Sequence, residues 1–324
     1  MADRLPYIDW LKVIGILLVV WGHWYPEICG MWIYSFHVPL FFMISGFLFR
    51  KESSYRIFIE KNVRSLVIPY FLLCLIAIIP SARMCIQHPE ILGIKLLGII
   101  CGFHTLWNVS CNGAMWFVYS LIIIKILGQI SGKWLNLALC LLSIIFAYLY
   151  NMESHGNNWS VVNSIVLYPF FVLGNIAKGS IKEASAWIRN HRLVSIAIAL
   201  LVFLSDLLLV RYNGMVWVFM GAVGKNLALF YINALAMSFV VYVLSCCLTF
   251  RNRNMEVVSS GTIVILALHF ILIGRMRPFI DRLHFNVYGM DIIEFCLSVL
   301  ILLIFIPVIR FTPSLLLGGR KKPS

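Results

Sequence analysis

Long apolar runs, separated by short polar or basic segments, follow one another along most of the chain. Most runs approach the roughly 20 residues that a helix needs to cross the hydrocarbon core of a bilayer. They lack the alternation, in segments of about ten residues, that marks a membrane β-barrel. The pattern therefore predicts an all-α fold, a polytopic transmembrane helical bundle of about ten spans. We expect the spans at residues 8–26, 32–49, 65–82, 114–131, 135–151, 161–177, 193–211, 227–248, 257–275 and 289–309.

One further apolar stretch, residues 91–107, is interrupted by Lys95, Gly98, Gly102 and His104. Backbone that is not regular helix is tolerated at membrane depth only where protein or a water-filled cavity surrounds it. We therefore expect this stretch to be interfacial or re-entrant rather than an eleventh span.

The placement of lysine and arginine between the spans predicts the orientation of the bundle. With the amino terminus in the cytoplasm, 18 of these residues fall on the cytoplasmic side and 7 on the outer side. An eleventh crossing at 91–107 would turn the basic segments 178–192 and 251–253 outward, against this rule. We therefore expect both termini in the cytoplasm, one transmembrane domain over 1–311 and a short cytoplasmic tail over 312–324.

Composition agrees with a membrane protein. Of the 324 residues 61% are apolar and 12% charged, with a mean hydropathy of +0.93, whereas a soluble domain has about 25% charged residues. No nucleic-acid motif accompanies the net charge of +13, so we expect no nucleic-acid partner. The nine cysteines contain no CxxC pair, which favours neither a metal site nor a disulfide scaffold. The first span carries Asp9 and Lys12 and is followed by no A-x-A-like site, so we expect it to be retained rather than cleaved.

Ionisable side chains inside the predicted spans are costly in a bilayer and are candidates for function. Asp9, Lys125 and Glu294 lie near span ends, where a side chain can instead reach the interface. His23 and His269 fit that explanation less well. The full set is Asp9, Lys12, His23, Lys125, Asp206, His269 and Glu294.

Lys12 and His23 lie on nearly the same face of the first span, because eleven residues make about three helical turns. They are about 16 Å apart along the axis, and an extended pantetheine arm covers on the order of 15–20 Å. A cation at Lys12 could hold a coenzyme A phosphate while His23 meets the thioester. Imidazole titrates near neutral pH and suits general-base catalysis on a sugar hydroxyl. The alternative is a hydrogen-bonded histidine at a helix end.

The second span ends in Ser45-Gly46, and a dense basic run follows it. Small residues let helices approach closely, and they could also leave room for a thin ligand arm. The basic run could set topology and contact anionic lipid. It could instead clamp the phosphates of coenzyme A, with arginine giving bidentate contacts. Its members are Arg50, Lys51, Arg56, Lys61 and Arg64.

These segments resemble the acyltransferase-3 family of membrane O-acyltransferases, in particular its fucose 4-O-acetylase-like members. The strongest resemblance lies within residues 5–70, and two short later segments add to it. The resembling segments are YIDWLK (7–12), WGH (21–23), FHVPLFFMISGFLF (36–49), RSLVIPY (64–70), MWF (115–117) and LALH (266–269).

The resemblance implies transfer of an acetyl or other short acyl group from cytoplasmic acyl-CoA to a carbohydrate, with acetyl-CoA as the donor substrate and no metal. It implies His23 as catalytic and Lys12 with Arg64 as donor-site residues. Most family members have arginine where this chain has Lys12, which keeps the charge but loses the planar fork. The further candidates are Lys61 and Ser45 for the donor site, and Asp9, His37, Trp116 and His269 for supporting roles.

We expect the protein in a bacterial-type plasma membrane, in contact with lipid, acyl-CoA and a carbohydrate acceptor. A transporter or flippase of lipid-linked sugars would also use intramembrane charge, although no internal repeat is visible. A membrane scaffold or sensor would not need the stripe of Lys12 and His23. Consumption of labelled acetyl-CoA separates the enzyme from both alternatives. Direct transfer and a covalent acyl-histidine intermediate both stay open.

Overall fold

The computed structural model describes residues 5–152, 159–248, 250–283 and 285–319. It is 81% helical, which confirms the predicted all-α class of a polytopic membrane protein. The named elements are α1 (Pro6–Gly22), α2 (Gly30–Leu48), α3 (Tyr55–Asn62), the π-helical turn η1 (Val63–Val67), α4 (Ile68–Ile78), α5 (Ala82–Gln87), α6 (Pro89–Cys101), β1 (Thr105–Leu106), β2 (Val109–Ser110), α7 (Trp116–Ile130), α8 (Lys133–Met152), α9 (Ser160–Ile176), α10 (Lys178–Asn190), α11 (Arg192–Asn213), α12 (Leu227–Cys247), α13 (Arg253–Ser260), α14 (Thr262–Ile280) and α15 (Val287–Phe311), with short 3₁₀ turns η2 (Ile79–Ser81), η3 (Gly113–Met115) and η4 (Val218–Met220).

The spans predicted from the apolar runs correspond to helices in the described part of the chain. Eight helical segments there are long and apolar enough to cross a bilayer, and the pair α9 and α10, bent by 66°, gives a ninth. The remaining predicted span, 8–26, is α1, which has 17 residues and therefore a length of about 25 Å. The orientation stays a prediction.

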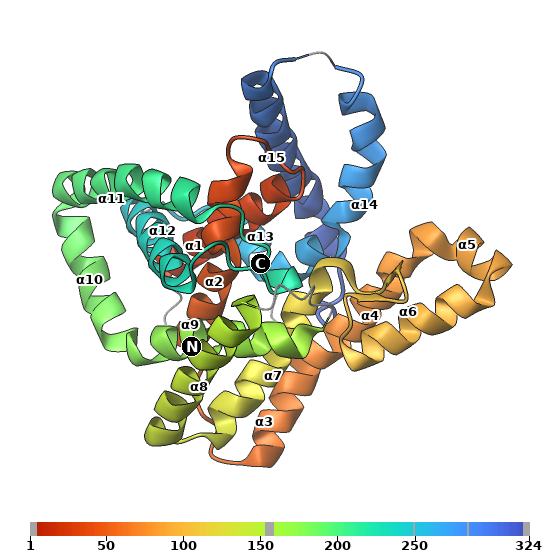
Figure 1. Ribbon diagram of the computed structural model, residues 1–324, viewed down its shortest axis with the longest axis horizontal. Helices are drawn as coiled ribbons and strands as arrows, with labels where there is room; N and C mark the ends of the chain where they lie inside the picture. Colours follow the sequence, from red (N-terminus) through yellow and green to blue (C-terminus); the bar gives the residue numbers. More distant parts are fainter. Residues whose placement is uncertain (1–4, 153–158, 249, 284, 320–324) are drawn as a thin grey trace.

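The stretch 91–107 does not form a continuous spanning helix. Its helix, α6, has 13 residues, a length of about 20 Å, and ends at Gly102 with φ 78°. The hairpin of β1 and β2 follows, with Thr105 opposite Ser110 and Leu106 opposite Val109. Figure 1 shows α4, α5 and α6 together as an arm at one side of the molecule.

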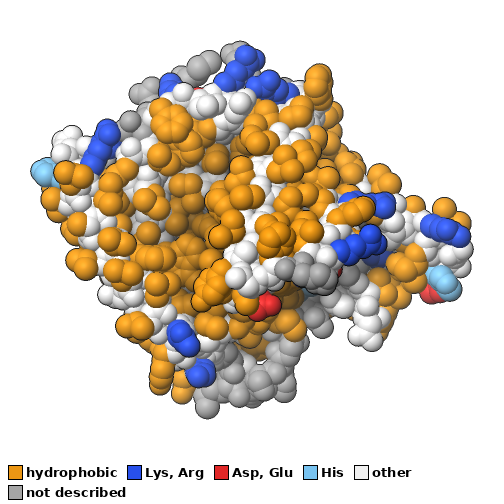
Figure 2. Space-filling model, turned by 90° about the horizontal axis from the view of Figure 1, so that it is seen from above, with side chains coloured by type: hydrophobic (Ala, Val, Ile, Leu, Met, Phe, Trp, Pro, Cys, Tyr) orange, Lys and Arg blue, Asp and Glu red, His pale blue; other side chains and the backbone are white. Residues whose placement is uncertain are grey.

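Helices α1 and α2 lie at the centre of the bundle, with α8, α11 and the hairpin of α14 and α15 around them (Figure 1). The spanning window of α2 is 61% buried within the protein, against 11% for α8 and 22% for α11. Figure 2 shows hydrophobic side chains over most of one face, with Lys and Arg in separate groups. The central helices therefore pack against protein, while the peripheral ones present their apolar side chains outward, as lipid contact requires.

Glycines bring α2 and α9 into backbone contact. A Cβ added at Gly46 would overlap the carbonyl oxygen of Phe171, and one added at Gly174 would overlap that of Met43. Small residues at such positions are typical of helix pairs in membranes. Gly46 thus serves helix packing, one of the two roles considered for Ser45-Gly46.

The described part of the predicted tail, residues 312–319, packs onto the bundle. Leu317 is 2% exposed, and a Cβ at Gly318 would lie 2.6 Å from the Ser65 carbonyl oxygen. This segment is therefore continuous with the folded domain rather than detached from it.

Candidate functional site

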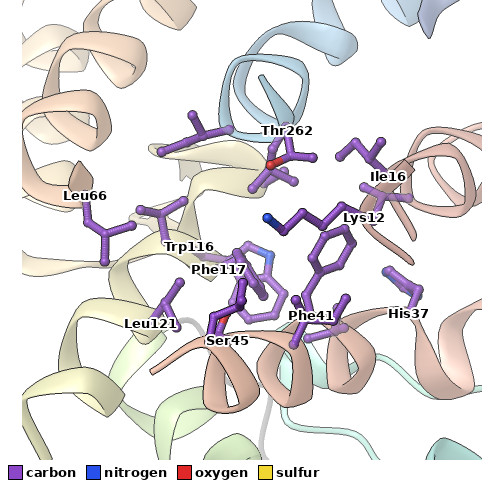
Figure 3. A pocket seen from close by; sticks show the side chains of 18 of the residues that line it. Lys12, Ile16, His37, Phe41, Ser45, Leu66, Trp116, Phe117, Leu121 and Thr262 are labelled. Atoms are coloured by element: carbon purple, nitrogen blue, oxygen red, sulfur yellow. The ribbon is translucent and has the colours of Figure 1, made fainter. Parts of the chain in front are cut away.

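A narrow cavity, here called the Lys12 cavity, lies between α1, α2, η1, α7 and the start of α14. Its volume is about 140 Å³. Lys12, Ile16, Val19 and His23 line it from α1, the positions that the helical period places on one face. Figure 3 shows the Lys12 side chain extending from α1 into the cavity. Among the described lining residues Lys12 is the one lysine or arginine.

The other walls bring three more predicted site residues to the same cavity. His37 and Ser45 line it from α2, and Trp116 lines it from the start of α7 (Figure 3). Ser45 therefore faces the cavity while its neighbour Gly46 faces α9, because successive helical residues point about 100° apart.

His23 stands at the end of α1, where it forms the C-cap, and contacts a histidine from α14. Its Nδ1 lies 2.7 Å from Nε2 of His269, and the ring centroids are 4.8 Å apart. His269 is fully buried, and its Nδ1 lies 2.8 Å from the carbonyl oxygen of Ile265. The structure thus brings together two predicted site residues that are 246 positions apart.

This chain of contacts fixes the tautomers of the two neutral rings. A carbonyl oxygen only accepts, so His269 donates from Nδ1 to Ile265 and its Nε2 carries a lone pair. That lone pair accepts a hydrogen bond from the Nδ1–H of His23. The Nε2 atom of His23 is then unprotonated, which is the state required of a general base.

His37 has the same kind of local arrangement one helix away. Its Nδ1 lies 2.7 Å from the carbonyl oxygen of Ile33, so its Nε2 also carries the lone pair when the ring is neutral. His23 and His37, the two histidines that line the Lys12 cavity, therefore both carry a lone pair on Nε2, and of these two only His23 contacts another histidine in the described structure.

The loop that follows His23 is anchored to the last two helices. The Asp291 carboxylate of α15 accepts hydrogen bonds from the backbone N–H groups of Glu27, Ile28 and Cys29, at 3.0, 3.2 and 3.0 Å. Nη1 of Arg277, on α14, donates to the Trp24 carbonyl oxygen at 2.6 Å. These contacts hold the end of α1 against α14 and α15.

A second cavity, here called the His104 cavity, lies beyond His23 and has a volume of about 160 Å³. It shares the lining residues His23, His37, Val38, Ala114 and Trp116 with the Lys12 cavity. The others include two tyrosines, Phe219, Phe270 and residues of the β hairpin. The complete lining is His23, Tyr25, Tyr34, His37, Val38, His104, Thr105, Ser110, Gly113, Ala114, Trp116, Val218, Phe219 and Phe270.

His104, in the loop before β1, is buried and held by Asn163. The Asn163 Nδ2 atom lies 2.9 Å from its Nε2. Its Nδ1 has no hydrogen-bond partner in the described structure. Burial lowers the pKa of His104 to about 4, so the ring is neutral near pH 7 and, with Nε2 accepting from Asn163, offers an N–H at Nδ1. Sequence reasoning noted His104 only as an interruption of the 91–107 stretch.

Four predicted site residues line neither cavity: His269, which contacts His23 from behind the cavity walls, and Asp9, Lys61 and Arg64. Asp9 accepts a hydrogen bond from Ser259 Oγ at 2.5 Å, which ties α1 to α13. Lys61 Nζ lies 2.9 Å from the Glu52 carboxylate. Arg64 is exposed in η1, although the two residues after it line the Lys12 cavity. Lys61 and Arg64 thus lie outside the cavity walls. Among the described residues no three His, Cys, Asp or Glu side chains are grouped as metal ligands.

The model of the acyltransferase-3 family, an acyltransferase domain, matches residues 5–311. The chain belongs to this family. The match extends the resemblance seen at residues 5–70 over nearly the whole of this membrane acyltransferase. No curated protein and no solved structure matches the chain.

Proposed function

We propose that this acyltransferase moves an acetyl or other short acyl group from cytoplasmic acyl-CoA to a hydroxyl of a cell-surface or lipid-linked carbohydrate, in a bacterial-type plasma membrane. The observation that carries the proposal is the position of His23, which lines both the Lys12 cavity and the His104 cavity. Two substrates that enter from opposite ends of α1 would meet at one imidazole.

The Lys12 cavity suits the donor. Its walls are largely apolar, with Ile16, Val19 and Phe41 among them, and a pantetheine arm is a thin chain that packs against such surface. The Lys12 ammonium favours a phosphate, since a charge-assisted contact is worth roughly twice a neutral one. Lys61 and Arg64 would meet the nucleotide phosphates outside the cavity, beyond the residues that η1 contributes to its wall.

The His104 cavity suits the carbohydrate. Tyr25, Tyr34, Trp116 and Phe219 supply aromatic faces for the C–H surface of a sugar ring, and aromatic walls with a few placed polar groups are typical of ligand sites. The Nδ1–H of His104 is available to a sugar oxygen. This arrangement fits a neutral, hydroxyl-rich acceptor better than a charged one.

The chemistry then follows from the tautomer of His23. Its Nε2 takes the proton of the acceptor hydroxyl as the oxygen attacks the thioester carbonyl. The tetrahedral intermediate collapses, the carbon–sulfur bond breaks, and the thiolate of coenzyme A leaves with the proton that His23 held. The Nε2 atom of His269 accepts a hydrogen bond from the Nδ1–H of His23 throughout and so stabilises the imidazolium. In the covalent alternative the acyl group passes through the same Nε2.

The test is an assay of acyl transfer with the purified full chain in liposomes. Labelled acetyl-CoA is supplied outside or inside, together with a panel of glycans and lipid-linked sugars. We expect coenzyme A release and an acetyl ester on one acceptor class. Movement of lipid-linked sugar across the bilayer without consumption of acetyl-CoA would contradict the proposal and favour a flippase.

A further inference from the structure

A third and wider space adjoins the start of α1 and the end of α2, where Leu48 lines both it and the Lys12 cavity. This space, here called the basic chamber, has a volume of about 840 Å³ and lies between the start of α1, the end of α2, α10 and the end of α12. None of its described lining residues is acidic. Its four basic residues are Arg50, Lys178, Lys182 and Arg189.

Three of these cations come from one face of α10. Lys178, Lys182, Ser185 and Arg189 recur at a spacing of four, three and four residues, which places them in one helical stripe. Like charges four residues apart destabilise a helix, so an anion bound between them would relieve that repulsion.

Helix α10 also has the character of a helix at a membrane interface. It turns by 66° from the end of α9, and its Trp187 is 47% exposed. Tryptophan is enriched at the level of lipid headgroups, and an amphipathic helix with a basic face lies in that plane. An interfacial α10 would leave α9 as the spanning part of this bent pair and would put the basic chamber at headgroup depth.

An apolar groove continues from the chamber along α2 and α12. It has a volume of about 320 Å³ and shares Ile8 and Phe47 with the chamber. Leu235 and Phe239 line it from α12 and are 38% and 37% exposed, so the groove opens toward the lipid-facing surface.

We propose that the basic chamber and this groove bind an anionic membrane phospholipid, with its phosphate headgroup among the four cations and one acyl chain in the groove. Charge complementarity selects a phosphate, and the continuous apolar groove selects a ligand that also carries a hydrocarbon chain. Basic pockets between membrane helices on the cytoplasmic side bind such headgroups, and the predicted orientation places the chamber on that side.

The experiment measures lipid binding to the purified full chain in a neutral detergent by native mass spectrometry. Phosphatidylglycerol is compared with phosphatidylcholine of the same chains, so that only the headgroup charge differs. We expect phosphatidylglycerol to bind at least tenfold more tightly. The variant Lys182→Gln/Arg189→Gln should lose about tenfold or more of that affinity. Lys133→Gln, an exposed lysine outside the chamber, should stay within twofold.

A second variant tests the groove. Leu235→Trp adds bulk where the acyl chain would lie, and the partly exposed position tolerates the larger side chain. The variant should bind phosphatidylglycerol more weakly, while its affinity for acetyl-CoA should not change. Equal affinity for the two lipids would overturn the proposal. So would a loss of phosphatidylglycerol affinity in the Lys133→Gln control as large as that in Lys182→Gln/Arg189→Gln. Displacement of the lipid by acetyl-CoA or inorganic phosphate would also overturn it, because the chamber would then be a site for soluble phosphates.

Discussion

The Lys12 cavity and the basic chamber, which both adjoin α1 and α2, differ in volume, in charge and in what they lead to. The Lys12 cavity is narrow, has one cation in its described walls and ends at a pair of hydrogen-bonded histidines. The basic chamber is several times larger, has four cations and continues into an apolar groove. Proton transfer at a thioester needs fixed groups and little water, because electrostatic interactions strengthen as water is excluded. Recognition of a headgroup needs only clustered charge at the right depth.

The same two helices serve both spaces because their side chains diverge by about 100° from one residue to the next. Ile8 lines the chamber and the groove, whereas Lys12 lines the cavity. Phe47 lines the chamber and Ser45 the cavity. Leu48 lines both spaces and Ile44 lines both the cavity and the groove. Substitutions of side chains that line only one space should leave the function of the other intact, and the following experiments test that separation.

The largest effect is expected for His23→Ala. Turnover per folded molecule should fall by about 10²–10⁴-fold, the usual contribution of a general base. Acyl-CoA should still bind, because Lys12 lies about 16 Å away along α1. Acetyl transfer and donor binding are measured together, with exposed His191→Ala as the matched control. Turnover within tenfold of the wild type would end the case for His23 as the base.

His269→Ala should lower turnover less than His23→Ala does, because it removes the acceptor of the His23 Nδ1 proton but leaves the Nε2 lone pair in reach of substrate. The expected signature is a changed pH profile of transfer at unchanged acyl-CoA affinity. A pH–rate profile identical to that of the wild type would show that His269 does not position His23.

Removal of the Lys12 cation should weaken binding of the acyl-CoA donor. Lys12→Ala is expected to reduce acyl-CoA affinity by about ten- to a hundredfold, the value of a charge-assisted contact. Arg64→Ala should have a smaller effect, because Arg64 is exposed and water and salt screen its charge. Isothermal titration with acetyl-CoA measures both. Lys182→Gln serves as the control, and a comparable loss there would mean that the basic chamber holds the donor.

Gly46→Ala should affect stability rather than either site. Its methyl group would overlap the Phe171 carbonyl oxygen, and such overpacking costs about 1–3 kcal/mol or more. Gly179→Ala is the matched control, since a Cβ there has no atom within 4 Å. Thermal unfolding in detergent compares the two variants. Equal melting temperatures would show that α2 and α9 do not depend on this contact.

The last effect concerns pH. Because burial lowers the pKa of His104 to about 4, the unfolded chain binds more protons than the native one between that value and about 6.5. The free energy of unfolding should therefore decrease as the pH falls from 7.5 to 5, by about 2 kcal/mol. His104→Gln should flatten this slope, whereas Lys182→Gln should leave it unchanged. Unfolding at the two pH values measures the difference.

The features that could be predicted from the sequence are those that depend on local patterns of residues. Apolar runs locate spans because a bilayer imposes one length on every helix, and the helical period placed Lys12 and His23 on one face. The contact between His23 and His269 joins residues from the first and fourteenth helices, and no local pattern encodes such a distance. The hydrogen-bond partner of His23 is a second imidazole that only the folded structure brings next to it.

The basic chamber was missed for a different reason. Residues 178–192 were interpreted as a cytoplasmic segment whose charges set topology, and that interpretation uses only their number. Their spacing carried the additional signal, because Lys178, Lys182 and Arg189 recur on one helical face. A periodicity test applied to short basic segments would have identified α10.

The clamp of Asp291 on residues 27–29 has a consequence for the way the chain is made. Synthesis begins at α1, yet both the partner of His23 and the carboxylate that fixes the following loop lie on α14 and α15. The ribosome has added most of the polypeptide before either contact can form, since chains emerge from the amino terminus. A nascent chain interrupted before α14 would insert its first helices, but its His23 would lack the hydrogen-bond partner that orients the ring.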